Sequence, residues 1–196
     1  MSRARALPLL ALAVVVGSSS ACGSSDTTAT TELPNCATGD QSASNGVVLM
    51  AQSVPTATWL PCLRTTLPLG WDFQHLDARN GSSRFWLNSD RDGQKAIEVR
   101  LADSCHTAGA TEIVSDREGM RRLERVTRTT PNFEGERYYV FDGGCITIVF
   151  NLTGDNPGEP LALATQAVGA MSRTDLQDQV HEESHGRLSL DPVEDR

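Results

Sequence analysis

The chain of 196 residues lacks several features that would point to a common class of function. Beyond residue 21, no apolar run approaches the roughly 18 residues of a membrane-spanning helix. Acidic residues outnumber basic ones by 25 to 17, and phosphate binding needs clustered Lys and Arg, so nucleic acid is not an expected partner. The sequence contains no G-x-S-x-G nucleophile motif. We therefore expect no catalytic residue, no metal site and no cofactor.

The N-terminus, in contrast, is typical of a secretory signal. Two arginines precede an apolar run at 7–17 that is too short to span a bilayer, and small residues follow. The sequence SSAC, ending at Cys22, resembles the lipobox of bacterial lipoproteins, although its first Ser stands where that pattern usually has an aliphatic residue. The alternative is an ordinary cleavage site with an incidental cysteine. The resemblance implies that residues 1–21 are removed and that lipidated Cys22 anchors the protein on the extracytoplasmic face of the bacterial cell membrane.

The rest of the chain divides by composition into three parts. Residues 22–35 consist mainly of Gly, Ser, Thr and Asp and have almost nothing to bury, so we expect a flexible tether. Residues 36–192 have the size of one ordinary domain, and residues 193–196 form a short tail. A tether behind a lipid anchor would hold the domain away from the membrane headgroups.

Four cysteines remain after Cys22, namely Cys36, Cys62, Cys105 and Cys145. An even number of cysteines in an exported chain predicts two disulfides. No C-x-x-C or similarly close pair is present, which argues against a zinc knuckle. Three pairings are open, and the sequence does not choose between them.

Alternation of apolar and polar residues with period two indicates β-strands along most of the domain. Expected strands lie at 46–52, 71–78, 83–90, 95–105, 111–114 and 120–127, with a hairpin over 135–152. The dipeptide Asn80-Gly81 is typical of a tight hairpin turn. Segment 120–127 could also be read as part of a capped helix, but Gly119 favours the strand. The three prolines of segment 53–71 predict an irregular connection.

Helical spacing appears only near the C-terminus. Apolar residues recur at helical intervals over 159–172, and Thr174-x-x-Gln177 is a capping box for a second helix that should end at Gly186. The expected fold class is α+β: an antiparallel β-meander sheet with one or two C-terminal helices packed on it, and two disulfides.

Several stretches resemble a family of uncharacterised secreted lipoproteins of actinobacteria. The stretches are QSVPTATWLPCL (52–63), LPLGW (67–71), RFWLNSDR (84–91), RYYVFDGGC (137–145) and GRLSLDP (186–192). They are distributed along residues 52–192 of the mature domain. The resemblance implies that the C-terminal helices belong to the domain, and it transfers no catalytic or binding residue.

The segment 181–185 matches H-E-x-x-H, a zinc signature of metalloproteases. On a helix, His181 and His185 would share one face, and Glu182 would activate a metal-bound water. A third protein ligand is missing, because the position at metzincin spacing is Asp191. We interpret the segment as a solvated surface helix, with a zinc-dependent hydrolase as the alternative.

Basic residues cluster once, over 117–128. The first interpretation is a solvated strand face balanced by nearby acids. The second is a docking patch, formed by Arg121, Arg122 and Arg125, for an anionic partner such as a cell-envelope polymer or an acidic protein.

Two adjacent aromatic pairs, Phe85-Trp86 and Tyr138-Tyr139, must point to opposite faces of the sheet. The second face is therefore either covered by the C-terminal helices, which we favour, or is an exposed aromatic surface. Altogether the sequence predicts a lipid-anchored extracytoplasmic protein without an identifiable activity. We expect a non-catalytic binding or assembly domain of the cell envelope.

Overall fold

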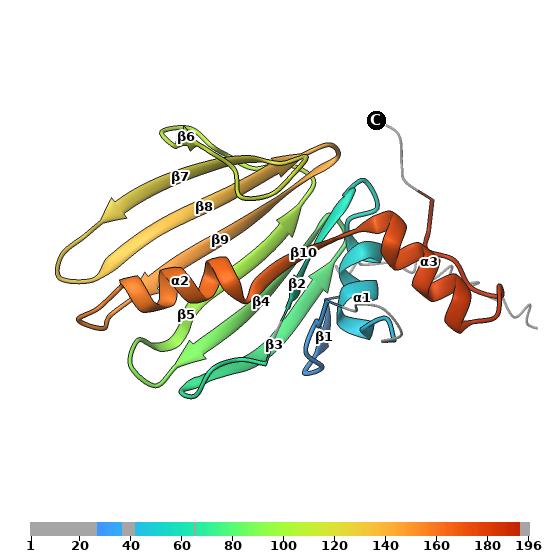
Figure 1. The fold of residues 1–196 in the computed structure, drawn as a ribbon, viewed down its shortest axis with the longest axis horizontal. Helices are drawn as coiled ribbons and strands as arrows, with labels where there is room; N and C mark the ends of the chain where they lie inside the picture. The colour runs from blue at the N-terminus through green and yellow to red at the C-terminus, as the bar shows by residue number, and fades with distance from the viewer. Residues whose placement is uncertain (1–26, 37–41, 65, 193–196) are drawn as a thin grey trace, which may run out of the picture.

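The computed structural model describes residues 27–36, 42–64 and 66–192, which form an antiparallel sheet covered by helices on one face (Figure 1). The eight strands of the sheet, in the order β1-β3-β4-β5-β9-β8-β7-β6, are β1 (Thr28–Thr30), β3 (Trp71–Arg79), β4 (Ser82–Ser89), β5 (Gly93–Ala102), β9 (Gly144–Leu152), β8 (Phe133–Phe141), β7 (Arg121–Arg128) and β6 (Thr111–Ile113). Two meanders, β3 to β5 and β6 to β9, are joined where β5 pairs with β9. The predicted α+β class with an antiparallel meander sheet is confirmed.

Tight turns connect the strands where the sequence indicated them. Gly81, in the predicted Asn80-Gly81 turn, has φ +82°, a conformation that glycine adopts without strain. Gly143, between β8 and β9, has φ +72°, and a Cβ atom there would lie 1.9 Å from the carbonyl oxygen of Thr56. The β8–β9 turn can therefore pack against the chain that follows the first helix only because position 143 is glycine.

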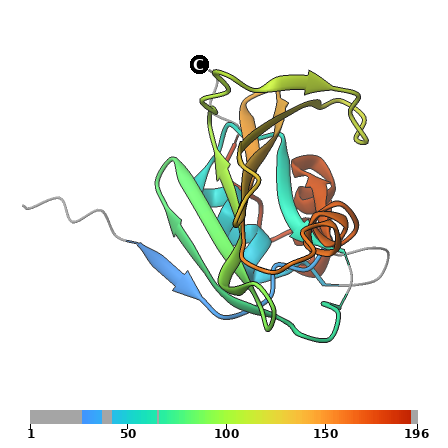
Figure 2. The same cartoon turned by 90° about the vertical axis from the view of Figure 1, so that its left-hand side faces the viewer.

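A second layer lies on one face of this sheet (Figure 2). It contains α1 (Asn45–Ser53), β2 (Trp59–Leu63), α2 (Gly158–Gln166), β10 (Val168–Ser172) and α3 (Arg173–Glu183). β2 and β10 form a two-stranded antiparallel sheet. β2 contacts β5 and β9, α1 contacts β3 and β4, and α2 contacts β9. The predicted helices at the C-terminal end are thus present and belong to the domain.

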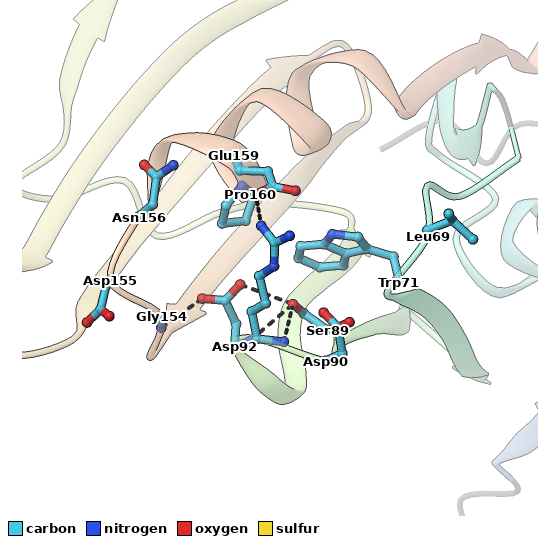
Figure 3. A pocket seen from close by; sticks show the side chains of 11 residues that line it. Leu69, Trp71, Ser89, Asp90, Asp92, Gly154, Asp155, Asn156, Glu159 and Pro160 are labelled. Atoms are coloured by element: carbon cyan, nitrogen blue, oxygen red, sulfur yellow. Dashed lines mark hydrogen bonds and ion pairs between the residues drawn. The ribbon is translucent and has the colours of Figure 1, made fainter.

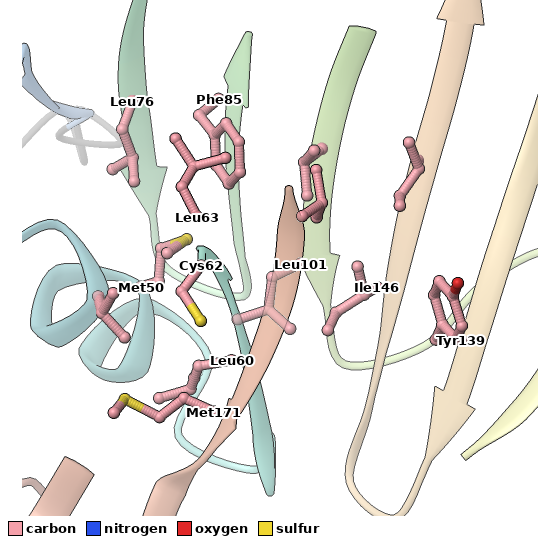
Figure 4. Packing of buried hydrophobic residues seen from close by; sticks show 14 of the residues in the cluster. Met50, Leu60, Cys62, Leu63, Leu76, Phe85, Leu101, Tyr139, Ile146 and Met171 are labelled. Atoms are coloured by element: carbon pink, nitrogen blue, oxygen red, sulfur yellow. The ribbon is translucent and has the colours of Figure 1, made fainter. Parts of the chain in front are cut away.

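The hydrophobic core fills the space between the two layers (Figure 4). The sheet contributes side chains such as Phe85, Leu101 and Ile146, and the second layer contributes Met50 and Leu60. All five are at most 1% exposed. Their complete burial is the main source of stability for this fold.

Residues 46–52, predicted to be a strand, belong to α1. Val47, Met50 and Ala51 are buried at helical spacing, so one face of the helix enters the core. The prediction was wrong because a short apolar run looks the same in a buried strand and in a buried helix. Packing of α1 against β2, β3 and β4 selects the helix.

Two further predictions are corrected by the pairing of β2 with β10. Segment 53–71, predicted to be irregular, contains β2, and the predicted helix over 159–172 ends at Gln166. Pro61 is tolerated in β2 because this small sheet has only two strands, so that both are edges. A Cβ atom at position 169 would lie 2.7 Å from Sγ of Cys36, so Gly169 permits the close approach of β10. Pairing between segments so distant in sequence leaves no local signal.

Helix α3 begins at Arg173, and its N-cap differs from the predicted one. The hydroxyl of Ser172 accepts a hydrogen bond from the backbone N–H of Asp175 at 3.0 Å. The predicted capping box does not form, because the side-chain oxygen of Gln177 accepts instead from the backbone N–H of Leu190, at 2.7 Å. The C-terminal segment is thereby fixed against α3.

Arg173 connects three parts of the second layer. It is buried and donates to the backbone carbonyl of Ala51 in α1 at 2.9 Å and to that of Asp191 at 2.8 Å. The segment 187–192 follows α3 without forming a strand. It is held instead by Arg173 and by burial of Leu190.

Both predicted disulfides form, and the pairing is Cys36–Cys62 and Cys105–Cys145. The first bond joins the segment before α1 to β2. The second joins the loop after β5 to the start of β9. Each links positions far apart in sequence, which restricts the unfolded chain and stabilises the fold.

Part of the predicted tether is ordered against the domain. Residues 28–30 form β1, which pairs with β3, and the carbonyl of Pro34 accepts a 2.7 Å hydrogen bond from the backbone N–H of Leu63. Residues 1–26 and the tail 193–196 lie outside the described residues. Within the described ranges, no helix is long and apolar enough to cross a membrane.

The second face of the sheet is neither covered by helices nor an exposed aromatic surface, so both sequence-based alternatives are wrong. Trp86 is 4% exposed because the cations of Arg84 and Lys95 lie over its ring, 4.9 and 4.8 Å from the centroid. His75 packs beside the same ring at 4.7 Å. Tyr138 is also buried, in a small cluster with Leu123 and Cys145. Long polar side chains and a disulfide cover this face.

Candidate functional site

A pocket of about 380 Å³ opens at one end of the large sheet (Figure 3). Three segments that are distant in sequence form its walls: the chain that leads into β3, the β4–β5 turn, and the loop after β9 with the first turn of α2. The lining residues are Leu69, Trp71, Ser89, Asp90, Arg91, Asp92, Gly154, Asp155, Asn156, Glu159 and Pro160.

Asp92 joins two of these walls. Its buried carboxylate accepts a 3.1 Å hydrogen bond from the hydroxyl of Ser89 and a 3.0 Å hydrogen bond from the backbone N–H of Gly154. The hydroxyl of Thr153 donates to the backbone carbonyl of Asp92 at 2.9 Å. A buried carboxylate with these partners holds the β4–β5 turn and the β9–α2 loop in a fixed relation. The pocket is therefore preformed.

The apolar part of the pocket consists of Leu69, Trp71 and Pro160. Figure 3 shows the indole of Trp71 directed across the pocket towards Pro160 and Glu159. The side chain of Leu69 is fully exposed at the mouth, at 102% relative accessibility. An exposed large apolar residue beside an aromatic ring offers a surface on which a ligand can be buried.

The polar part of the pocket contains hydrogen-bonding groups that the protein itself does not use. Within the described part of the chain, the side chains of Asp90 and Asp155 form no hydrogen bond or ion pair, and both residues are exposed. Asn156 adds an amide, and Arg91 pairs with Glu159 at 2.5 Å. Acceptors and donors therefore surround one aromatic platform.

Glycine 70 fixes the position of Asp90. Gly70 has φ +85°, and its carbonyl accepts the backbone N–H of Asp90 at 2.9 Å. A Cβ atom at position 70 would lie 2.6 Å from a carboxylate oxygen of Asp90. Any larger residue would displace that carboxylate from the pocket rim.

The H-E-x-x-H segment does not have the geometry that a zinc site requires. His181 lies in the last turn of α3, but the helix ends at Glu183 and His185 has φ +53°. The predicted continuation to Gly186 is wrong, and the two imidazoles do not share a helical face. Among the described residues, no group of three or more His, Cys, Asp and Glu side chains could hold a metal ion.

The three arginines of the predicted docking patch are each engaged with a carboxylate. Arg121 pairs with Glu112 at 2.6 Å, Arg122 with Glu124 at 2.6 Å, and Arg125 with Glu136. Alternation along β7 also places Arg122 on the opposite face from Arg121 and Arg125. The structure brings the three residues onto one strand without forming a continuous basic surface.

The sequence did not single out the residues of the pocket. The acid-rich turn NSDRDG (88–93) was the one available signal, but nothing in it indicates that Gly154 and Glu159 lie beside it. Those residues arrive through the pairing of β5 with β9, which is a long-range feature.

The predicted lipidation site, Cys22, lies outside the described residues. No protein-family model, no curated protein and no solved structure matches this chain.

Proposed function

We propose that the protein is a lipid-anchored, non-catalytic binding domain on the extracytoplasmic face of the bacterial cell membrane, and that the Trp71 pocket binds a neutral saccharide unit of a cell-envelope polymer. Export and anchoring are supported by the signal-like N-terminus, by the lipobox-like sequence at Cys22 and by the resemblance to secreted lipoproteins of actinobacteria. The two disulfides support an oxidising compartment.

One observation carries the proposal for the ligand. The pocket combines an indole platform with carboxylates at Asp90 and Asp155 that have no protein partner in the described chain. A saccharide ring presents an apolar C–H face that can stack on Trp71 and hydroxyl groups that donate to carboxylates. The donors Arg91 and Asn156 match the acceptor oxygens of the same ring.

The charged side chains at the pocket rim distinguish neutral from charged envelope polymers. Asp90, Asp155 and Glu159 stand at the pocket rim against the single cation of Arg91. An anionic polymer would be repelled there, and a purely cationic ligand would leave the donors of Arg91 and Asn156 unused. A neutral sugar uses both the donors and the acceptors.

The proposal is tested by sedimentation with insoluble, delipidated envelope glycan, using purified protein that carries Cys22→Ser. Leu69→Ala and Leu188→Ala form a matched pair, because both leucines are exposed and only Leu69 lines the pocket. We expect Leu69→Ala and Asp155→Asn each to weaken retention about tenfold, and Leu188→Ala to leave it unchanged. Equal retention of all four proteins would rule out the pocket as the glycan site.

Anchoring is tested separately in a bacterial host that exports the protein and is grown with an alkyne-tagged fatty acid. We expect the wild-type chain to incorporate the label and the Cys22→Ser variant to remain unlabelled and to be released from the membrane. Label on both proteins would contradict lipidation at Cys22.

A further inference from the structure

The described chain begins beside a group of arginines on the second face of the large sheet. Thr27 precedes β1, which pairs with β3 at the edge of that sheet. Thr27 lines a pocket of about 310 Å³, to which Arg79, Arg84 and Arg100 also belong. The three arginines point away from the core, because side chains alternate along a strand and the neighbours of each arginine are buried in the core. The chain therefore enters the fold at a surface that carries three cations.

The outermost charges of this surface are positive. Arg79 is exposed, and within the described chain it forms no ion pair. The side chains of Arg84 and Arg100 are 49% and 46% exposed. Their carboxylate partners, Asp77 and Glu98, are only 22% and 14% exposed. A molecule that approaches this surface thus meets guanidinium groups before it meets carboxylates.

Arg84 and Arg100 lie directly opposite each other on β4 and β5. Like charges in directly opposed positions destabilise a sheet. Compensation is uneven, because Arg100 lies 2.8 Å from Glu98, whereas Arg84 lies 4.0 Å from Glu98 and 3.9 Å from Asp77. The guanidinium of Arg84 therefore keeps N–H groups that an external anion can use.

The proposed lipid anchor is close to the same surface. Cys22 precedes Thr27 by five residues. Because an extended chain spans at most about 3.6 Å per residue, Cys22 is within about 18 Å of Thr27. The pairing of β1 with β3 shortens the expected tether, so an anchor at Cys22 keeps this surface near the headgroups.

The Trp71 pocket is at the other end of the same strands. Trp71 begins β3 and Arg79 ends it, so about 25 Å of strand separates them. The pocket also includes Glu159 and Pro160 of α2, which belongs to the second layer. In Figure 2, β1 is on the left and α2 and α3 are on the right. The anchored end of the domain and the pocket therefore lie at opposite ends and on opposite sides of the sheet.

We propose that the surface formed by Arg79, Arg84 and Arg100 contacts anionic phospholipid headgroups, and that this contact directs the Trp71 pocket away from the membrane. This orientation rests on the anchoring at Cys22 proposed above. Attraction between exposed cations and an anionic membrane acts over about a Debye length, and the anchor keeps the arginines near enough for it to act. Acidic residues on the far side of the domain are screened at that distance.

Labelling of arginines with phenylglyoxal, read by mass spectrometry, tests the contact on a chain that starts at Cys22. This chain retains every described residue, and Cys22 is its only free thiol because the other four cysteines form disulfides. The thiol is coupled to maleimide-bearing lipid in vesicles of phosphatidylglycerol or of phosphatidylcholine. Since this anchor is attached chemically, the result does not depend on lipidation in the cell, which the fatty-acid label tests.

We expect Arg79, Arg84 and Arg100 to be labelled about fivefold more slowly on the anionic vesicles than on the neutral ones. High salt should remove the difference. Arg91, in the Trp71 pocket, and Arg187, after α3, are the internal controls, because both are exposed and distant from the arginine surface. Each should be labelled at the same rate on both kinds of vesicle.

Arg79→Gln removes the cation of the group that has no ion pair in the described chain. We expect it to reduce the protection of Arg84 and Arg100 about twofold, whereas the matched variant Arg187→Gln should leave their protection unchanged. Equal labelling of Arg84 and Arg100 on both kinds of vesicle would overturn the proposal. Slower labelling of Arg91 on the anionic vesicles would overturn it as well, because the pocket would then face the membrane.

Discussion

The phenol of Tyr138 donates a 2.5 Å hydrogen bond to the carboxylate of Glu136, two residues earlier on the same face of β8. Burial raises the pKa of Tyr138 to about 12, and the bond to Glu136 acts in the same direction. Burial also raises the pKa of Tyr139, on the opposite face. Both tyrosines of the chain are therefore harder to ionise than the ordinary phenol, whose pKa is 10.0.

This relationship predicts the tyrosinate absorbance of the protein. Because the chain has only two tyrosines, and the pKa of each is raised, titration at 295 nm in native buffer should show little ionisation at pH 10 and the transition of Tyr138 near pH 12. In denaturant the transition should return to about pH 10. The folded state keeps its protons where the unfolded chain loses them, so stability should fall as pH rises above 10.

Glu136→Gln removes the charged acceptor and leaves the burial of Tyr138. We expect its native transition to move part of the way back towards the ordinary value. A native titration centred on pH 10 in the parent protein would contradict the described environment of Tyr138.

Asp92 gives a prediction about stability. Asp92→Ala leaves the backbone N–H of Gly154 and the hydroxyl of Ser89 without their acceptor and should lower the free energy of unfolding by about 1–3 kcal/mol. Urea unfolding measures the loss. Asp90→Ala is the control, since that exposed carboxylate has no partner, and its effect should stay within about 0.5 kcal/mol. Equal effects would mean that Asp92 does not join the two loops.

Glu124 gives a prediction about the stability of the protein at acid pH. Burial opposes its ionisation, but hydrogen bonds from Arg122 and Arg137 outweigh burial and lower its pKa below the ordinary 4.5. A lowered folded pKa contributes stability that is present above pH 4.5 and is lost as pH falls through the folded value. Glu124→Gln should therefore cost more stability at pH 7 than at pH 3, measured as the urea midpoint.

Glu118→Gln serves as the comparison for Glu124, because Glu118 is exposed. Its urea midpoint should follow that of the parent protein across the same range of pH. If the loss of stability in Glu124→Gln, relative to the parent protein, is the same at every pH, the charge of this carboxylate contributes nothing to stability.

The strands were predictable where the burial pattern is local. β3, β4 and β5 alternate apolar and polar residues, and each lies within a few residues of its predicted bounds. The helix α1 was not predictable from periodicity, because Val47 and Val48 favour a strand locally and packing reverses that preference. β2 and β10 exist only as partners of each other, so neither has a pattern of its own.

The candidate pocket and the disulfide pairing were not predictable from local sequence, because both depend on long-range strand pairing. Cysteine count predicted two disulfides but not their pairing, because pairing depends on which strands become neighbours. Trp71 begins β3 and Asp92 lies in the turn after the neighbouring strand β4, whereas Asp155 joins them only after β9 pairs with β5. The H-E-x-x-H spacing predicted a shared helical face that a left-handed residue at His185 prevents.

The central claim is that the Trp71 pocket binds a neutral saccharide, and chemical-shift mapping of the ¹⁵N-labelled protein with neutral oligosaccharides such as cellotriose and chitotriose tests it most directly. We predict saturable shifts of the indole N–H of Trp71 and of backbone amides in 89–92 and 154–159, with those in 121–128 unchanged. Absence of saturable shifts with every oligosaccharide, or shifts confined to residues outside the pocket, would contradict the account.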